Sequence, residues 1–212
     1  MDIKLILTDM DGTAVDYPNE PFRSSWDAIG DSLGEERRKE WYRVRDHYIG
    51  KKDQYLEWVK AQLRLIKHIP REGLLRSVLP IPYFADALSF FPSLNGTYVT
   101  GMVTSGFPLV VERASKDLHL DFCLYEDLCL ENPDSITSIR NQWEKDIWLE
   151  EFLARSYPGI RLEDHVCYIG DHDIDISLFK RVALPLTINP KSKAVRKHAM
   201  EIKTFSEILD II

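Results

Sequence analysis

The sequence has no apolar run of the length that a membrane span requires, which is about 20 residues. It is also poor in cysteine, and Cys123, Cys129 and Cys167 form no Cys-x-x-Cys pair, so neither a disulfide framework nor a thiolate metal site is expected. The first residues show no basic segment and no cleavage site of small residues, and we therefore expect no secretory signal. These absences predict a cytoplasmic protein in a reducing compartment, with no membrane as partner.

An excess of basic residues is also absent. The 212 residues hold 27 Lys and Arg against 34 Asp and Glu, a formal net charge of -7, which argues against nucleic acid as a partner. Residues 16–83 carry 13 basic and 11 acidic residues, whereas the remainder carries 14 and 23. A slightly basic segment above an acidic site would attract an anionic substrate once metal neutralises the acids, although solvation of helix faces explains most of these charges equally well. The oligomeric state is not indicated.

Apolar segments of strand length alternate with helical patterns along most of the chain. Strands are expected over residues 5–8, 98–103, 121–125, 165–169 and 184–188, and helices over 85–91, 109–118 and 145–156. This alternation predicts an α/β fold with a doubly wound parallel sheet. Between these elements, Asn132-Pro133-Asp134 suggests a hairpin turn, and Asn189-Pro190 suggests the start of a helix. No internal repeat or low-complexity linker interrupts the pattern.

Residues 16–83 lack strand patterns. Helical spacing is found over residues 23–33, 35–48 and 53–67, and a shorter helical piece begins at residue 71. A small all-helical cap domain inserted after the first strand is therefore expected, with residues 1–15 and 84–212 forming the core. Trp26, Trp41 and Trp58 are expected to pack between the cap helices, and lining the mouth of a site is the alternative for some of them.

The first apolar strand ends in acidic residues. Asp9 and Asp11 follow residues 5–8, and Gly12-Thr13 come next. Side chains alternate along a strand, so both carboxylates would point the same way, at the strand end where open α/β sheets bind ligands. Such a pair suits a metal, a nucleophile or an acid–base pair. A strand that merely ends in a polar turn is the alternative.

Three further segments place polar residues at strand or helix ends. Thr104-Ser105-Gly106 follows a strand, where a hydroxyl and backbone N–H groups can hold a phosphate oxygen. Lys145 begins a helix, and an ordinary surface lysine is the alternative for it. Gly170-Asp171 follows another strand, with Asp175 four residues on. Carboxylate oxygens at this spacing suit magnesium.

Two further residues, Asp173 and His172, lie beside these acids in the sequence. Asp173 lies between Asp171 and Asp175, and it either contributes to the same site or faces solvent. His172 is expected to be a loop side chain, because magnesium favours oxygen over imidazole.

These four segments, in this order, resemble the four motifs of the haloacid dehalogenase superfamily. The likeness is greatest to its phosphoserine-phosphatase-like proteins, whose Ser-Gly-Gly-Phe-like second motif compares with residues 104–107 here, and it covers nearly the whole core. The resemblance implies a Rossmann-like core with a cap. It also implies that Asp9 is the nucleophile and Asp11 the general acid and base. Thr104 would hold the phosphate, with Ser105 as the alternative after a one-residue slip.

The resemblance further implies the ligand sets of the site. Lys145 would hold the phosphate and offset the charge of Asp9. Magnesium (Mg2+) would be held by Asp9, Asp171 and the Met10 carbonyl. Asp175 would contribute to the same site either directly or indirectly. Asp11 is grouped with the metal residues as a neighbour in the Met10-Asp11 loop. The residues expected around the phosphate are Gly12, Thr13, Ser105 and Gly106.

The function expected is therefore a magnesium-dependent phosphatase acting on a small phosphorylated metabolite through an aspartyl-phosphate. A phosphoserine phosphatase proper, a phosphomutase on the same core and a non-catalytic phospho-ligand binding protein are the alternatives. A receiver-type signalling domain would be shorter and would lack the helical insertion. In the cap, Gln62 stands where the subgroup uses a basic residue to hold serine, and the acidic partner falls near Asn19-Glu20, so phosphoserine is expected to be a poor substrate.

Overall fold

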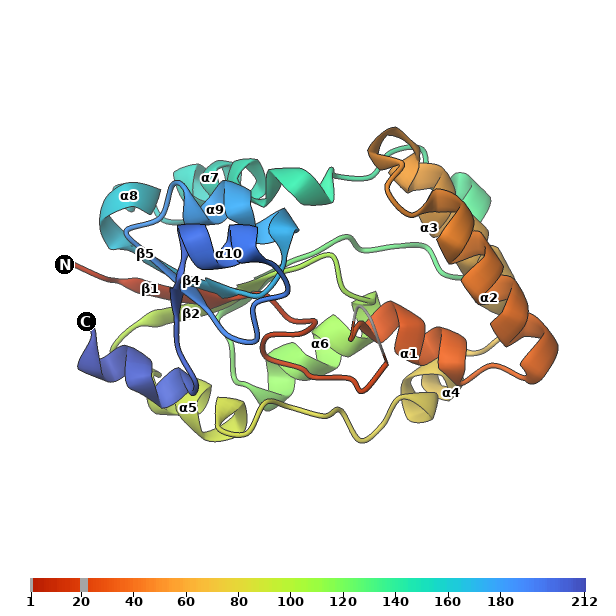
Figure 1. Cartoon of the computed structure of the whole chain (residues 1–212), viewed down its shortest axis with the longest axis horizontal. Helices are drawn as coiled ribbons and strands as arrows, with labels where there is room; N and C mark the ends of the chain where they lie inside the picture. Colours follow the sequence, from red (N-terminus) through yellow and green to blue (C-terminus); the bar gives the residue numbers. More distant parts are fainter. Residues whose placement is uncertain (1, 20–22) are drawn as a thin grey trace.

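The computed structural model describes residues 2–19 and 23–212, and Glu20 therefore lies outside the described residues. A six-stranded sheet forms its centre, with strand order β3-β2-β1-β4-β5-β6 (Figure 1). All five strand pairings are parallel, which confirms the predicted α/β fold. The strands are β1 (Leu5–Thr8), β2 (Val99–Val103), β3 (Phe122–Leu124), β4 (Val166–Gly170), β5 (Leu184–Thr187) and β6 (Met200–Glu201).

Helices cover both faces of the sheet. On one face lie α7 (Lys145–Ser156), α8 (Leu162–His165), α9 (Ile176–Phe179) and α10 (Lys193–His198) (Figure 1). On the other lie α5 (Ala87–Ser93), α6 (Pro108–Asp117) and the C-terminal 3-10 segment η5 (Phe205–Asp210). Leu5 and Leu7 of β1 pack into the first layer and Ile6 into the second. The central strand is apolar at consecutive positions because both of its faces are buried.

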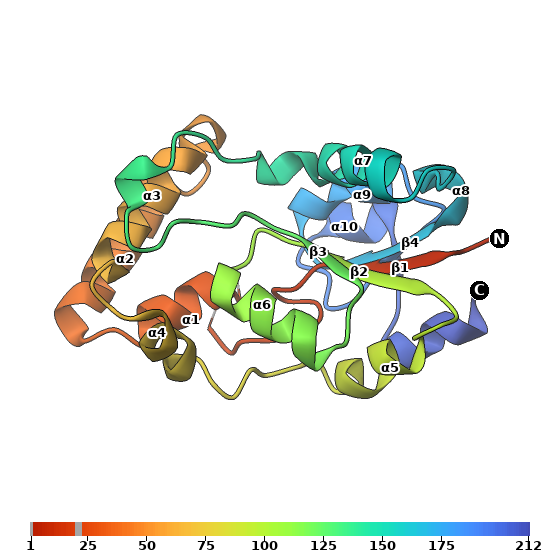
Figure 2. The same ribbon diagram turned by 180° about the vertical axis from the view of Figure 1, so that it is seen from behind.

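Four helices lie beyond the carboxyl ends of the strands, on the side of the molecule away from the chain termini (Figures 1 and 2). They are α1 (Ser25–Asp31), α2 (Glu35–Tyr48), α3 (Tyr55–Ile66) and α4 (Arg71–Ser77), with a 3-10 turn, η1 (Lys52–Gln54), before α3. Ser24 caps α1, since its hydroxyl accepts a hydrogen bond from the Asp27 amide. All four fall within residues 16–83, and the division into core and cap remains a prediction.

Residues 125–144 differ from the expected hairpin. They form two 3-10 turns, η2 (Pro133–Ser135) and η3 (Gln142–Glu144), with irregular chain between them. Figure 2 shows this segment leaving β3, running out to α3 and returning to α7. An ion pair joins Arg64 of α3 to Asp134 at the outer turn. A stretch that the sequence pattern assigned to the core therefore lies against α3.

The helix start expected at Asn189-Pro190 is displaced along the chain, and the C-terminal segment begins at a capping box. Asn189 has a φ of +50° and does not cap a helix; α10 begins instead at Lys193, because the Ser192 hydroxyl accepts hydrogen bonds from the Ala194 and Val195 amides. The capping box of Thr204 and Glu207 is present and begins η5. Among residues 2–19 and 23–212, no helix has the length and apolar character needed to cross a bilayer.

Candidate active site

Strand register gathers the predicted residues at one edge of the sheet. Thr8 at the end of β1 pairs with Met102 of β2 on one side and with Ile169 of β4 on the other. The residues that follow these three strand ends, among them Asp9, Thr104 and Asp171, are therefore brought together. The order of the strands reverses at β1 and β4, which is where open α/β sheets form their binding crevice.

Three buried carboxylates and one lysine form the centre of the site. Asp9, Asp171 and Asp175 each place an oxygen within 4.8 Å of the others. Lys145, in the first turn of α7, is fully buried, and its Nζ donates to Asp9 Oδ1 at 2.8 Å and to Asp175 Oδ1 at 2.7 Å. The lysine is thus not the surface residue of the alternative interpretation; it holds two of the acids in place.

Asp175 is already saturated with hydrogen bonds. Its Oδ1 accepts from Lys145 and from the Tyr168 hydroxyl at 2.7 Å, and its Oδ2 accepts from the Asp171 and His172 amides at 3.2 and 3.1 Å. A carboxylate oxygen has two lone pairs, so little of this side chain remains for a metal. Asp175 therefore positions Lys145 and the loop that carries Asp171.

The site holds more negative charge than its lysine can balance. Burial raises the pKa of Asp171 well above its usual range, and the charges of Asp9 and Asp175 add to the effect. Burial also raises the pKa of Asp9 to about 6, against the opposing charge of Lys145. The only further ammonium near Asp171 among the described residues is Lys191, at 3.9 Å from Oδ2. Buried carboxylates in excess are costly unless a cation pairs with them, and hard oxygen donors fit a hard metal ion.

Asp11 lies outside the group of three carboxylates. Its Oδ1 accepts from the Ser25 amide at 2.9 Å and its Oδ2 from the Ser25 hydroxyl at 2.8 Å. The same hydroxyl accepts from the Phe107 amide at 2.8 Å. Burial raises the pKa of Asp11 to about 7, although the Ser25 hydrogen bonds oppose this. A carboxyl group with such a pKa can both give and take a proton near neutral pH.

The expected metal-binding carbonyl is engaged elsewhere. Met10 O accepts hydrogen bonds from the Thr13 and Val15 amides at 3.2 and 2.9 Å, which close the turn after β1. The carbonyl of Asp11, by contrast, accepts no hydrogen bond from the described residues. The carbonyls of Gly12 and Thr13 likewise accept none from the described residues, so Asp11 O, which is the nearest of the three to Asp9 along the chain, is a better candidate metal ligand than Met10 O.

Gly12 and Thr13 both lie against the Asp171 carboxylate. Gly12 has a φ of +81°, and a Cβ atom there would lie 2.2 Å from Asp171 Oδ2. The hydroxyl of Thr13, which is fully buried, donates to Asp171 Oδ1 at 3.2 Å. Their contact with a phosphate remains a prediction, since the structure shows both residues against the carboxylate.

Replacing Gly12 and Gly96 by Ala, one at a time, separates the effect of the close approach to Asp171 from the effect of backbone strain. Gly96 has nearly the same φ, +80°, but a Cβ there would meet nothing within 4 Å. A left-handed alanine costs roughly 1–2 kcal/mol at either position. We expect Gly96→Ala to lose about this much free energy of unfolding and Gly12→Ala to lose more, whereas only Gly12→Ala should also lower turnover, by about tenfold or more, by displacing Asp171. Equal turnover in the two variants would show that the function of Asp171 does not depend on the space that Gly12 leaves for its carboxylate.

The second motif lies against the same centre. Thr104 is buried, and its Oγ1 accepts from the Gly106 amide at 3.0 Å, which leaves the hydroxyl hydrogen to be donated. Ser105 Oγ donates to Gln142 Oε1 at 3.2 Å. Gly106 is tightly enclosed, because a Cβ there would lie 2.3 Å from Met10 Cε. The geometry favours Thr104 over Ser105 as the phosphate donor.

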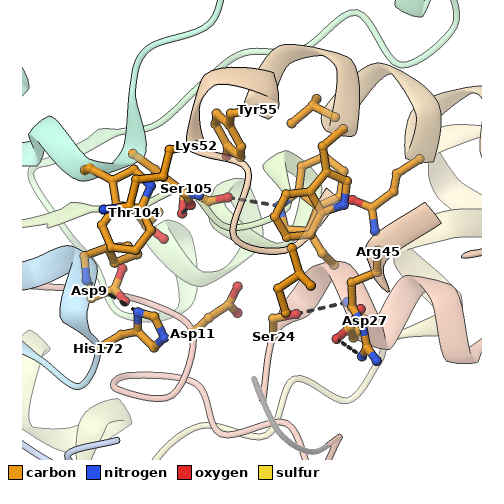
Figure 3. A pocket seen from close by; sticks show the side chains of 18 of the residues that line it. Asp9, Asp11, Ser24, Asp27, Arg45, Lys52, Tyr55, Thr104, Ser105 and His172 are labelled. Carbon is orange, nitrogen blue, oxygen red and sulfur yellow. Dashed lines mark hydrogen bonds and ion pairs between the residues drawn. The ribbon is translucent and has the colours of Figure 1, made fainter. Parts of the chain in front are cut away.

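A cavity of about 320 Å³ opens above these residues. Asp9, Asp11, Asp171, Thr104 and Ser105 line its inner part. Side chains of α1, α2, α3 and η3 line much of the rest, together with residues that include Lys52 of η1 and His172. Figure 3 shows Asp9 and Thr104 at one side of the cavity and the Asp27–Arg45 pair at the other.

Comparisons with known proteins agree with this arrangement. No protein-family model matches the chain. A curated relative, the phosphoserine phosphatase of Methanocaldococcus jannaschii, is 27% identical over 214 residues, covering 99% of this chain and 97% of the relative. A solved phospho-aspartyl intermediate analogue of phosphoserine phosphatase has a TM-score of 0.71 at 24% identity and covers 100% of both chains. A HAD family hydrolase of Salmonella enterica serovar Typhi has a TM-score of 0.75 at 17% identity, covering 94% of this chain and 67% of that one.

In sequence the chain is similar to a phosphoserine phosphatase, and in fold it is similar to a hydrolase of the haloacid dehalogenase superfamily. All four segments that resembled the superfamily motifs meet at one sheet edge, around Asp9. Within the superfamily its likeness is to the phosphoserine-phosphatase-like subgroup.

Sequence reasoning missed several residues of this site. Ser25 carries no motif signal, yet its amide and hydroxyl both donate to Asp11. Tyr168 looked like an ordinary strand residue, yet its hydroxyl lies 3.3 Å from Lys145 Nζ. Lys191 follows a turn, with nothing in the local pattern to single it out. Of the tryptophans, Trp41 packs in the interior as expected, whereas Trp26 and Trp58 line the cavity.

Proposed function

We propose that this protein is a magnesium-dependent phosphatase that hydrolyses a small phosphomonoester through an aspartyl-phosphate formed on Asp9. The observation that carries the proposal is the buried Asp9–Lys145 pair at the inner end of a cavity. A lysine bonded to a carboxylate at this depth offsets negative charge where a phosphate would enter. The aspartyl-phosphate is further supported by the similarity to the phosphoserine phosphatase solved as a phospho-aspartyl intermediate analogue.

The chain's own residues supply the acid–base and nucleophilic steps. An Asp9 carboxylate oxygen forms a bond to phosphorus while the bond from phosphorus to the alcohol oxygen breaks, and Asp11 gives that oxygen its proton. Asp11 then takes a proton from the water that attacks phosphorus, which releases inorganic phosphate and restores Asp9. The Thr104 hydroxyl and the Lys145 ammonium hold the phosphoryl oxygens during both steps.

The donors present fit a magnesium ion. Asp9, Asp171 and the Asp11 carbonyl would hold it, and Asp175 would act indirectly by orienting Lys145 and the Asp171 loop. When bound, the ion supplies the charge neutralisation that lets an anionic carboxylate approach an anionic phosphate. A small phosphorylated metabolite as substrate and the cytoplasm as location belong to the same proposal.

A phosphoserine phosphatase proper is the second candidate. It is favoured by the name of the Methanocaldococcus jannaschii relative, which matches along nearly its whole length. It differs from the first candidate only in the leaving group, so the two share one test of the chemistry.

That test is hydrolysis of p-nitrophenyl phosphate with magnesium, followed by trapping of labelled phosphate on the protein. We expect release of p-nitrophenol and label that maps to the peptide containing Asp9. Absence of turnover with this ester and with a panel of phosphorylated metabolites would reject the phosphatase. Transfer of the label to an added sugar phosphate, with dependence on a bisphosphate, would identify a phosphomutase instead.

Asp11→Asn should slow both half-reactions, because the same carboxyl group donates a proton in one and accepts a proton in the other. General acid–base catalysis contributes about 10²–10⁴-fold, and we expect losses of that order in formation and in breakdown of the aspartyl-phosphate. Rapid-quench measurement of the two steps checks this. Asp134→Asn is the matched control, since it makes the same chemical change at an exposed carboxylate that does not line the cavity, and it should leave both steps unchanged. Unchanged half-reactions in Asp11→Asn would reject the role.

A further inference from the structure

The part of the cavity beyond the carboxylates is lined by aromatic rings from three separate segments. Trp26 comes from α1, Tyr55 and Trp58 from α3, and Trp143 from η3. Tyr55 and Trp58 stand edge to face, with ring centroids 6.4 Å apart. All four rings are only half-buried, so they retain apolar surface toward the cavity. A group of this kind favours a flat apolar ligand, which gains both burial and ring–ring contact.

Charged groups in the same wall are committed to each other. Asp27 is 3% exposed; its Oδ2 accepts from Arg45 Nη1 at 3.1 Å and its Oδ1 from Trp41 Nε1 at 3.2 Å. Arg45 also donates from Nε and Nη2 to Asp46 and lies over the Tyr42 ring at 4.5 Å. This pair joins α1 to α2, and breaking it to bind a ligand would leave buried charge unpaired.

The remaining polar contributions to this wall are uncharged or lie toward the catalytic side. Gln62 is 3% exposed and its side chain makes no hydrogen bond to any described residue. Its amide can meet a neutral polar group but cannot balance a carboxylate. Lys52 holds its Nζ 3.7 Å from the Trp143 ring centroid, and Figure 3 shows it on the side of Thr104 rather than of Asp27. That position suits the phosphate end of a ligand.

We propose that the leaving group of the substrate is an uncharged aromatic alcohol whose ring packs among Trp26, Tyr55, Trp58 and Trp143. This inference rests on the proposed phosphatase function and names its substrate class. Among residues 2–19 and 23–212, the charged side chains of this part of the wall are paired with each other, so the amino and carboxylate groups of serine would be desolvated here without an uncommitted partner of opposite charge from these residues, which is costly. An aromatic ring fills the same space at no such cost.

The deciding measurement is kcat/KM for 2-phenylethyl phosphate, ethyl phosphate and L-phosphoserine with magnesium. 2-Phenylethyl phosphate and ethyl phosphate release alcohols of similar basicity. The ratio of their kcat/KM values therefore reports the binding of the phenyl ring. A single methylene in an apolar pocket is worth about 10-fold or more, and we expect at least that preference for the phenylethyl ester over the other two. A ratio near one, or phosphoserine as the best substrate, would overturn the proposal.

Two variants test where the ring binds. Trp58→Leu should reduce the phenylethyl-to-ethyl ratio of kcat/KM by about threefold or more, since it removes one aromatic face. Tyr48→Leu is the matched control, because Tyr48 is an aromatic residue of α2 that does not line the cavity, and the ratio should stay at the wild-type value. An equal fall in both variants would contradict the placement of the ring.

Calorimetry on the wild-type protein separates this inference from the proposed chemistry. The non-hydrolysable 2-phenylethylphosphonate should bind at least about tenfold more tightly than ethylphosphonate, whether or not the protein turns over any ester. Equal affinities would overturn the aromatic leaving group while leaving the phosphatase in place. Absence of hydrolysis together with a clear preference for the phenylethyl compound would reject the phosphatase and keep the ring-binding site.

Discussion

Asp9→Asn is expected to abolish turnover, by about 10⁴-fold or more, while the protein stays folded. Aspartyl-phosphate formation needs a carboxylate oxygen as nucleophile, and the amide of asparagine is a far weaker one. The fold should survive because Lys145, which loses one charged partner, keeps Asp175 at 2.7 Å. Steady-state hydrolysis of p-nitrophenyl phosphate gives the size of the loss, and circular dichroism with thermal unfolding checks the fold.

Asp134→Asn is the matched control for this variant. It makes the same chemical change at an exposed carboxylate that pairs with Arg64 outside the cavity, and it should leave turnover near the wild-type value. If Asp9→Asn retains turnover within tenfold of wild type, Asp9 is not the nucleophile.

Removal of the metal is expected to have an effect of similar size. Thorough chelation by EDTA should stop turnover and added magnesium should restore it, because three carboxylates are crowded within 4.8 Å beside one lysine. Magnesium should also stabilise the folded protein, since a ligand at 100 times its dissociation constant adds about 2.7 kcal/mol to the free energy of unfolding. Thermal unfolding at increasing magnesium concentration measures this without reference to activity. Turnover undiminished after chelation would contradict the metal requirement.

Asp171→Asn and Asp173→Asn form a matched pair within one loop. Asp171 is buried in the carboxylate group, whereas Asp173 is exposed and accepts a hydrogen bond from Ser192. The first variant should need far more magnesium for both turnover and stabilisation, and the second should behave as the wild type. A similar response in the two variants would remove Asp171 from the metal site.

The positions of the catalytic candidates along the chain could be read from the sequence. Asp9, Thr104 and Asp171 each follow a short apolar segment, and in a parallel sheet all such segments end at the same edge. That argument needs only the polarity pattern and the parallel sheet that alternating strands and helices imply. It therefore predicted the fold and the meeting of the four motifs, including Lys145 on a helix that begins beside them.

Which atoms contact one another was decided only in three dimensions. Ser25 bonds Asp11 and Tyr168 bonds Asp175, but no periodicity in the sequence records the direction of a side chain or the competition for a lone pair. Hydrogen bonds of this kind also occupy the Met10 carbonyl, which accepts from the Thr13 and Val15 amides.

The wall of the cavity likewise depended on tertiary structure. Trp143 lies in the segment 125–144, where a hairpin turn was expected at residues 132–134, yet this segment runs out to α3 (Figure 2), and Trp143 lines the cavity together with Trp26 and Trp58. An irregular segment has no repeating hydrogen bonds or apolar period to reveal its path, so its course is set by contacts such as that between Arg64 and Asp134. The sequence by itself therefore determined the fold class and the residues at the carboxyl edge of the sheet, whereas tertiary packing decided which side chains line the cavity, because that lining is built from segments far apart in the chain.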